Sequence, residues 1–172
     1  MAPHKEVVLK LTSMRYRKPG VSEEAFHEHA RAHGPKAAAI QARHGALRVS
    51  HYHTPSSTRA LLQQSLPWTI RSGFHIADHD ITISVWVRMP ETMTAIVMDP
   101  DFQALVGADN EMQDGERGTV DMGWEEVYVE DGRVVNVGEG GESEYPPYGA
   151  AKNVGRGSGV GNEGGAEKVI DF

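Results

Sequence analysis

The sequence contains no cysteine and no long apolar run. Without cysteine the chain has no disulfide bonds, thiolate nucleophiles or cysteine-ligated metals, which fits a reducing compartment. No segment approaches the about 20 apolar residues that a membrane-spanning helix requires. The N-terminal Met1-Ala2-Pro3-His4-Lys5 lacks the apolar stretch of a secretory signal. We therefore expect a soluble, cytoplasmic protein with no membrane partner.

Runs of basic residues are also missing. The chain has 17 Lys and Arg against 24 Asp and Glu, which gives a formal net charge of -7. This balance argues against a nucleic-acid partner, because phosphate binding needs a concentrated positive surface. The length of 172 residues suits one domain with a sizeable core and an appendage.

Histidine, in contrast, is concentrated in one stretch: three of the nine histidines lie between residues 27 and 33. On a helix, residues three and four apart share a face. One such face would carry Phe26, His29, His33, Ala37 and Ile40, whereas His27 and Arg31 would point away from it. Two imidazoles on an apolar stripe are either core-edge histidines or titratable groups in a dry pocket, where a small pKa shift decides their charge.

Alternating and helical patterns divide the chain into elements. Apolar alternation predicts strands over residues 6–16, 47–54, 81–89 and 120–129. Helices are expected over 22–44, with a kink or break at Pro35, over 56–65, and from Pro90 onward with a restart at Asp99-Pro100. Trp68 is the expected anchor of the connector that precedes the third strand.

Glycine dominates the composition from Gly138 to Gly165. Such a segment buries too little surface to offset its ordering entropy. We therefore divide the chain into a domain over 1–137 and a Gly-rich tail over 138–172, which is flexible or packs on a partner subunit. Residues 168–172 would dock as an extended end.

The order of elements is βαββαβ with an inserted short helix, an α+β, ferredoxin-like plan with an antiparallel sheet. Helices cover one face of the sheet. Because the strand patterns place apolar side chains on both faces, a second copy would cover the other face. The predicted assembly is a homodimer that forms a dimeric α/β barrel.

Short motifs in a fixed order resemble a known family, the EthD-like dimeric α/β-barrel proteins, and among them the small fungal decarboxylases that act on atrochrysone carboxylic acid-type polyketides. The similarity covers roughly residues 6–135 and departs where the family has Asp-Glu and this chain has Asp109-Asn110. The motifs are Arg17-Lys18-Pro19-Gly20, Ser22, Phe26, His33-Gly34-Pro35, His44-Gly45, Tyr52-His53-Thr54-Pro55, Asp78-His79-Asp80, Asp99-Pro100 and Asp109.

The resemblance implies a cofactor-independent lyase that decarboxylates a β-keto or aromatic polyketide acid. Such a reaction needs an acid for the developing enolate oxygen, a role that suits an imidazole. The expected catalytic residues are His33, His51, His53 and Asp80, the last as a residue that orients a histidine or only caps its strand. The expected substrate-binding residues are Phe26, His29, Tyr52, Trp86 and Arg15, the last by pairing with a carboxylate.

Other functions remain open at this stage. His29 and His33 have the i, i+4 spacing of a metal pair, but the sequence shows no clear third ligand, so no metal and no cofactor are predicted. The same pocket suits a polyketide cyclase, a dehydratase or a cofactor-free, anthrone-type oxygenase. A non-catalytic ligand-binding dimer is the remaining alternative. Product mass separates the enzymes, and tolerance of histidine substitution would indicate the binding module.

Overall fold

The computed structural model describes residues 5–66 and 73–156. Trp68 and residues 168–172, for which the sequence predicted an anchor and a docking end, lie outside this range. The elements are β1 (Leu9–Arg15), α1 (Glu23–Arg43), β2 (Arg48–His53), α2 (Ser56–Ser65), β3 (Ile81–Val87), α4 (Pro90–Val97), α5 (Pro100–Asp109), β4 (Thr119–Trp124), β5 (Val129–Glu130), β6 (Arg133–Val134) and α6 (Tyr148–Ala151).

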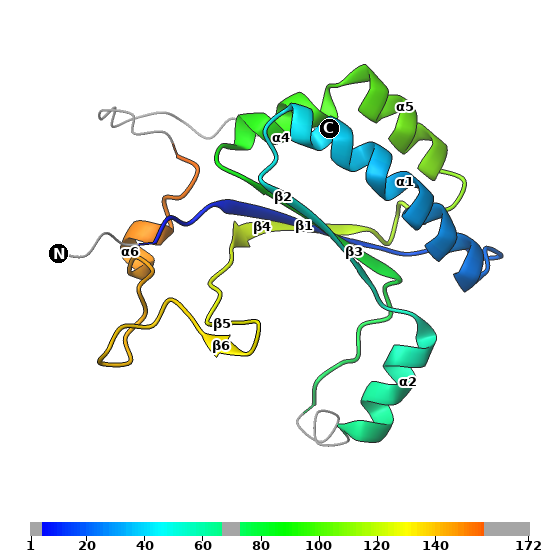
Figure 1. Ribbon diagram of the computed structural model, residues 1–172. Helices are drawn as coiled ribbons and strands as arrows, with labels where there is room; N and C mark the ends of the chain where they lie inside the picture. Colours follow the sequence, from blue (N-terminus) through cyan, green and yellow to red (C-terminus); the bar gives the residue numbers. More distant parts are fainter. Residues whose placement is uncertain (1–4, 67–72, 157–172) are drawn as a thin grey trace.

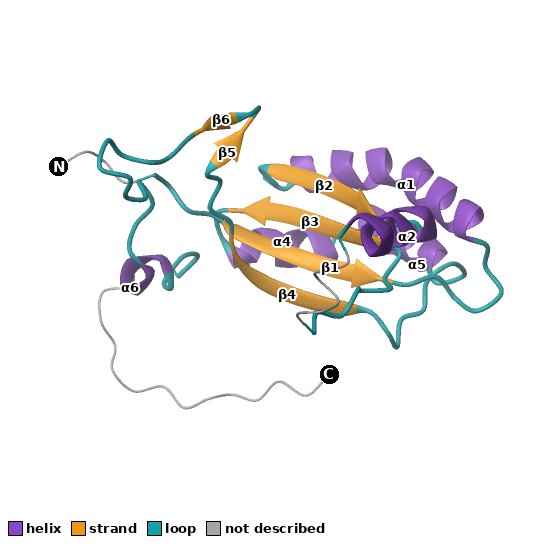
Figure 2. Cartoon of the chain, turned by 90° about the horizontal axis from the view of Figure 1, so that it is seen from below, coloured by secondary structure: helices purple, strands orange, loops and turns teal. Residues whose placement is uncertain are grey.

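The four long strands form one antiparallel sheet in the order β2-β3-β1-β4. This order, with α1 and the α4–α5 pair as the two crossovers, is the predicted ferredoxin-like α+β fold. Figures 1 and 2 show α1, α4 and α5 on one face of the sheet and α2 on the other. The C-terminal ends of β1 and β2 and the start of β3 lie at the same edge of the sheet, beneath α1.

Helix α1 begins as the sequence predicts, because the side chain of Ser22 accepts a hydrogen bond from the backbone N–H of Ala25. The predicted break at Pro35 is wrong, since the helix runs uninterrupted from Glu23 to Arg43. Pro35 and Arg31 are both exposed. Water can therefore solvate the Arg31 carbonyl, which Pro35 leaves without its intrahelical partner.

The helix-covered face of the sheet holds the apolar core. The predicted alternation in β3 is confirmed: Ile81, Val85 and Val87 are 1%, 2% and 0% exposed. Leu9 of β1 joins the last two in a buried cluster. Phe26, near the start of α1, is 2% exposed. The core thus fixes α1 across the sheet, and the histidines of α1 lie at the edge of this core.

The other face of the sheet carries apolar side chains, as predicted, but polar side chains are more numerous on it. The register brings Thr12 of β1, Ser50 of β2, Ser84 of β3 and Asp121 of β4 into one polar row across the sheet. Trp86 stands on this face with Lys10 and Arg48 over its ring, at 4.8 and 4.7 Å from the centroid.

The segment after Gly138 was predicted to be flexible or to pack on a partner, but as far as Arg156 it packs on its own chain. Ala151 of α6 is 1% exposed and Tyr145 is 7% exposed. Val154 packs against the cluster around Leu9. The hydroxyl of Tyr145 accepts a hydrogen bond from the Val127 N–H at 2.9 Å. Sparse apolar residues are thus enough to fix this part of the Gly-rich segment.

β4 ends at Trp124, five residues earlier than the sequence predicts, and the chain then turns into the β5–β6 hairpin. Gly132 at the hairpin turn adopts a φ of 73°, the left-handed region that glycine tolerates best. None of the helices described reaches the length and apolarity that crossing a bilayer requires.

Candidate active site

A pocket lies between α1, α5 and the helix-covered face of the sheet, with a cavity volume of about 60 Å³. Its apolar wall consists of Phe26, Ile81, Ile83, Phe102, Leu105 and Val106. Its polar groups are Arg15, His29, His33, Gln41, His51, Asp109 and Gln113. Ligand sites usually measure about 300–1,000 Å³, so this cavity is small by comparison.

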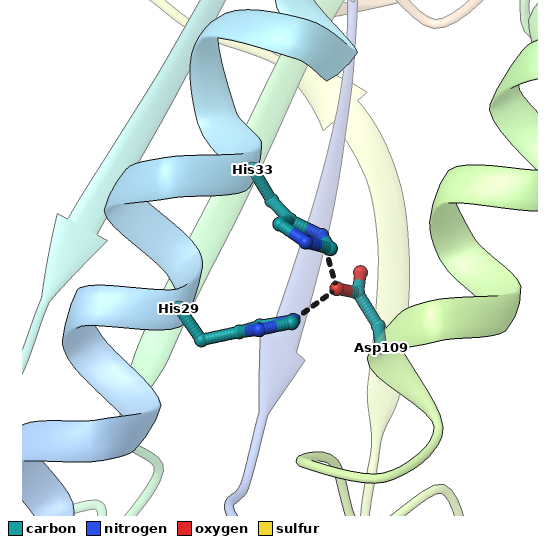
Figure 3. Close-up of side chains that lie close together, drawn as sticks. All are labelled: His29, His33 and Asp109. Atoms are coloured by element: carbon teal, nitrogen blue, oxygen red, sulfur yellow. Dashed lines mark hydrogen bonds and ion pairs between the residues drawn. The ribbon is translucent and has the colours of Figure 1, made fainter.

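Two histidines of α1 meet one carboxylate of α5 in this pocket (Figure 3). The Nε2 of His29 lies 2.7 Å from Oδ1 of Asp109, and the Nδ1 of His33 lies 2.8 Å from the same oxygen. The two imidazole rings are stacked at a slant, with centroids 3.9 Å apart. All three side chains are half-buried. The predicted pair on one helix face therefore shares a single anionic partner.

This arrangement constrains where the protons sit. A carboxylate oxygen only accepts, so His29 donates from Nε2. The Nδ1 of His33 is close to the oxygen but buried and outside hydrogen-bond geometry. Asp109 thus accepts a hydrogen bond from His29 and lies against the ring of His33.

Arg15 at the end of β1 supplies the positive charge of the pocket. Its guanidinium donates to Oε1 of Gln113 at 2.8 Å and to Oγ of Ser13 at 3.1 Å. Burial lowers the pKa of Arg15, and the nearby charge of Asp109 raises it. These contacts hold the side chain inside the protein rather than in solvent.

His51 of β2 lines the pocket opposite α1, where it is packed against Gly34. A Cβ at position 34 would lie 3.0 Å from Cε1 of His51. Burial lowers the pKa of His51, and the charges of His53 and Arg15 lower it further. His51 is therefore neutral near pH 7 and can donate one hydrogen bond from a fixed tautomer.

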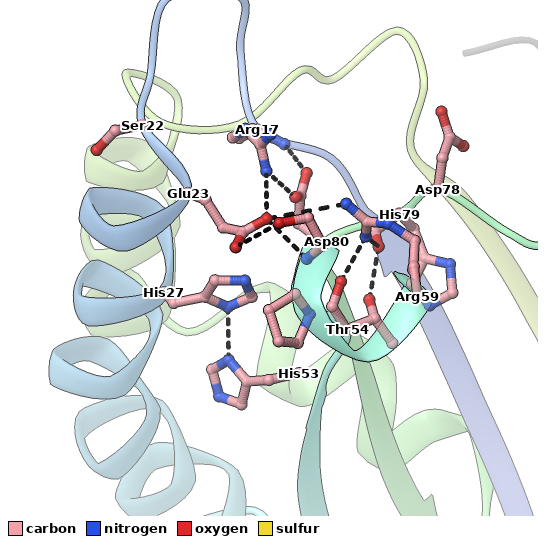
Figure 4. Close-up of polar contacts among 12 residues, drawn as sticks. Arg17, Ser22, Glu23, His27, His53, Thr54, Arg59, Asp78, His79 and Asp80 are labelled. Carbon is pink, nitrogen blue, oxygen red and sulfur yellow. Dashed lines mark hydrogen bonds and ion pairs between the residues drawn. The ribbon is translucent and has the colours of Figure 1, made fainter. Parts of the chain in front are cut away.

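His27 and His53 form a second imidazole pair outside the pocket (Figure 4). Their Nδ1 atoms lie 2.8 Å apart, so one ring donates to the other. The prediction that His27 points away from the sheet is wrong, and its Nε2 is buried. The helix turns by about 100° per residue, so a residue next to the Phe26 position still reaches the edge strand β2. Burial is the main cause that lowers the pKa of His53, and the charge of His27 lowers it further.

Asp80 lies near this second pair, and its backbone N–H donates to the carbonyl of Arg15 at 2.9 Å, but its carboxylate is engaged by Arg17. Its carboxylate accepts from the backbone N–H of Arg17 at 2.9 Å and pairs with the Arg17 guanidinium. It therefore ties the start of β3 to the turn before α1, and the prediction that it orients a catalytic histidine does not apply to His33 or His51.

Tyr52 and Trp86 were expected to bind substrate, but neither lines the pocket. Both belong to the opposite face of the sheet, where Tyr52 is 66% exposed and Trp86 is 7% exposed. A strand alternates its faces residue by residue, so His51 and His53 cannot share a face with Tyr52. By the same alternation, Trp86 lies on the face of the sheet opposite that of Val85 and Val87.

Among the described residues, two groups of side chains present three metal-ligating atoms within 4.8 Å of one another. One is His29, His33 and Asp109; the other is Glu23, His27 and Asp80. The sequence-based argument against a metal rested on a missing third ligand, and α5 supplies one for the first group. In the second group, the Arg17 guanidinium already pairs with both carboxylates.

Among the polar residues of the pocket, sequence reasoning missed Asp109, Gln113 and Gln41. Asp109 stood only among the family motifs, and Gln113 was not singled out. A signal for Asp109 existed, because a carboxylate in the last turn of a helix that packs beside His29 and His33 is a natural imidazole partner. For Gln113 the sequence gives none, since its contact with Arg15 spans 98 residues.

Comparison with known proteins agrees with this architecture. The model of the EthD domain matches residues 18–112. The decarboxylase claH of Passalora fulva is 32% identical over 74% of this chain and 82% of its own length. A provisionally named oxygenase of Aspergillus terreus is 31% identical over 76% of the chain and 81% of its length. The conidial pigment biosynthesis dehydratase EthD of Metarhizium robertsii is 29% identical over 78% and 94%. The chain therefore belongs to the EthD domain family.

Proposed function

We propose that this protein is a lyase that removes carbon dioxide from a β-keto or aromatic polyketide acid in the pocket between α1, α5 and the sheet. The observation that carries the proposal is the pairing of His29 and His33 with Asp109 beside the buried cation of Arg15. Relatives named decarboxylase, dehydratase and oxygenase support an enzyme of this kind.

In the proposed reaction, the substrate carboxylate loses carbon dioxide and its electron pair moves to the neighbouring carbonyl, which becomes an enolate. Arg15 stabilises negative charge in the pocket as that charge moves from carboxylate to enolate. His33, as an imidazolium held by Asp109, gives its proton to the enolate oxygen. The enol then returns to the keto or phenol form, so each turnover consumes one proton and needs no cofactor.

The apolar wall of Phe26, Ile81 and Phe102 supports this chemistry in a second way. It removes water from the carboxylate, and a less hydrated carboxylate releases carbon dioxide more readily. Neutral His51 on the opposite wall offers a hydrogen bond without adding charge. The catalytic roles of His53 and Asp80 remain predictions, because both residues lie outside the pocket. There, His53 supports His27 and β2.

The test is incubation of the purified protein with a panel of polyketide acids, followed by mass spectrometry of the products. Loss of carbon dioxide supports the proposal, whereas loss of water or gain of oxygen would assign a dehydratase or an oxygenase to the same pocket. A protein that binds these acids and changes none of them would be the binding module.

The residue test is His33→Ala on a substrate so identified. Loss of a general acid lowers rates by about 10²–10⁴-fold, and we expect kcat to fall in that range. His33 is half-buried, so the folded protein should persist. Arg31→Ala is the matched control: Arg31 lies on the exposed side of the same helix, with 70% of its side chain accessible. Full activity of folded His33→Ala would refute the histidine mechanism.

A further inference from the structure

The cluster of His29, His33 and Asp109 has a property that the proposed reaction does not use. It presents three ligand atoms of the kinds that transition metals prefer, all within 4.8 Å of one another. We propose that this cluster binds one divalent first-row transition metal in octahedral coordination. The ion would bind one nitrogen of each imidazole and an oxygen of Asp109, and so inhibit the lyase reaction. The inhibition rests on the proposed function; the binding does not.

The distances favour octahedral over tetrahedral coordination. For metal–ligand bonds of about 2.1 Å, neighbouring ligand atoms lie about 3.0 Å apart in an octahedron and about 3.4 Å apart in a tetrahedron. In the cluster, the nitrogens of His29 and His33 lie 2.7 and 2.8 Å from Oδ1 of Asp109. A small outward movement of Asp109 reaches the octahedral value. Two histidines and one carboxylate on one side leave three positions open to water.

A second observation concerns the Nδ1 atom of His33. It is buried and lacks a hydrogen bond, although the carboxylate oxygen is only 2.8 Å away. A buried nitrogen in a native protein normally has a partner. A metal ion above the shared oxygen would accept the lone pair of this nitrogen. Because His29 and His33 lie one turn apart on an uninterrupted helix, their separation is set before the ion arrives.

Arg15 opposes the binding of a cation. Its positive charge lies near Asp109, and its bonds to Gln113 and Ser13 keep it there. Removal of this charge by Arg15→Gln should tighten metal binding, since repulsion across a partly buried site is poorly screened. Arg17 opposes cation binding more strongly at the second cluster, because it pairs with the carboxylates of both Glu23 and Asp80. We therefore expect no second site at that cluster.

The experiment uses the full chain without substrate. Co²⁺ and Ni²⁺ are titrated by calorimetry, and the visible spectrum of the Co²⁺ form is recorded. We expect one ion per chain and the weak bands of octahedral Co²⁺. Asp109→Asn and His29→Gln should each weaken binding more than about 100-fold, beyond the 10–100-fold loss for residues that only support ligands. If Asp109→Asn fails to fold, His29→Gln alone carries the test.

Two variants serve as matched controls. His44→Asn removes a half-buried imidazole near the end of α1 that pairs with Asp99 at 2.6 Å, so it resembles His29 without the second histidine. His27→Gln disables the other three-residue group. Both should bind as the unaltered chain does. Binding that survives Asp109→Asn and His29→Gln, or that is lost in either control, overturns the site.

Further outcomes separate the parts of the proposal. Intense tetrahedral bands of Co²⁺ would overturn the octahedral assignment. Decarboxylation that continues at full rate in the metal-loaded protein would overturn the inhibition. Metal binding by a protein that decarboxylates none of the acids would leave the site intact and refute only the proposed function.

Discussion

At the scale of single residues, Asp109 is the side chain on which the pocket depends. One of its carboxylate oxygens lies within 2.8 Å of a nitrogen of both His29 and His33. It also raises the pKa of Arg15 against the effect of burial. The departure from the family pattern at Asn110 leaves this carboxylate in place, so the loss of the second acid does not affect the imidazole pair.

Buried histidines make the stability of the protein depend on pH. Burial is the main cause that lowers the pKa of His51, His53 and His79 below their ordinary value of 6.5. The unfolded chain therefore takes up protons first as pH falls. Stability is complete above pH 6.5 and is lost as pH falls through the lowered pKa values.

We expect the urea midpoint to be lower at pH 5.5 than at pH 7.5. His79→Gln should reduce this difference, because His79 lies outside the pocket and its Nδ1 is buried without a partner. The pH interval lies above the ordinary pKa values of Asp and Glu, so carboxylates contribute little. An equal pH dependence in the variant would show that His79 is not one of the responsible groups.

At the scale of elements, the contact between α1 and β2 depends on one glycine. Gly34 is an ordinary helical residue, and its lack of a side chain admits the ring of His51. The sequence motif His33-Gly34-Pro35 thus combines an imidazole, the space for another imidazole, and a proline that the exposed side of the helix tolerates.

Gly34→Ala tests this contact. Alanine favours a helix over glycine by about 1 kcal/mol, but the new Cβ lies 3.0 Å from Cε1 and 3.3 Å from Nδ1 of His51. We expect nearly unchanged stability and a loss of turnover, because the ring must move.

Gly107→Ala in α5 is the matched control, since a Cβ there meets nothing within 4 Å. It should stabilise the protein by about 0.5–1 kcal/mol and leave turnover unchanged. Equal activity of the two variants would show that the position of His51 is unimportant.

At the scale of the whole molecule, the segment that follows Gly138 belongs to the fold at least to Arg156. Tyr145 and Ala151 are buried, Tyr145 accepts a hydrogen bond from Val127, and the partly buried Val154 packs against the cluster around Leu9 of β1. The domain boundary at 137/138 remains a prediction from the composition of the sequence. A deletion tests whether residues 1–137 fold alone.

A chain that ends at residue 137 should be less stable than the full chain. Removal of buried apolar groups costs about 1–3 kcal/mol at each such site, and 1 kcal/mol corresponds to about 2–4 °C for a chain of this length. We expect Tm to fall by at least about 5 °C. Val154→Asp in the full chain should lower Tm in the same direction, and an unchanged Tm in both would restore the interpretation of a flexible tail.

The homodimer remains a prediction. Within the described residues, only α2 lies over part of the sheet face that carries Thr12, Ser84 and Trp86. Light scattering at micromolar concentration should give about twice the chain mass of 18.8 kDa. Thr12→Arg puts a charge in the middle of this face and should yield the monomer. A monomer in the unaltered protein, or a dimer that tolerates the arginine, would place the interface elsewhere or exclude it.

The sequence by itself determined the elements and their order. Ser22 marks the start of α1, Asp99 caps α5 by accepting from two backbone N–H groups, and the alternation from Ile81 to Val87 defines β3. These features are local, because caps and side-chain periodicity depend on neighbours within one turn or one strand. The order of elements also predicted the ferredoxin-like plan, which the sheet order β2-β3-β1-β4 confirms.

Only the tertiary structure decided which side chains meet. The partners His29 and Asp109 are 80 residues apart in the chain, and Arg15 and Gln113 are 98 apart. The side on which His27 lies follows from how α1 crosses the sheet, and the polar row through Thr12 follows from the register of the strands. Crossing angle and strand register arise from the packing of the whole core, and no short stretch of sequence specifies them.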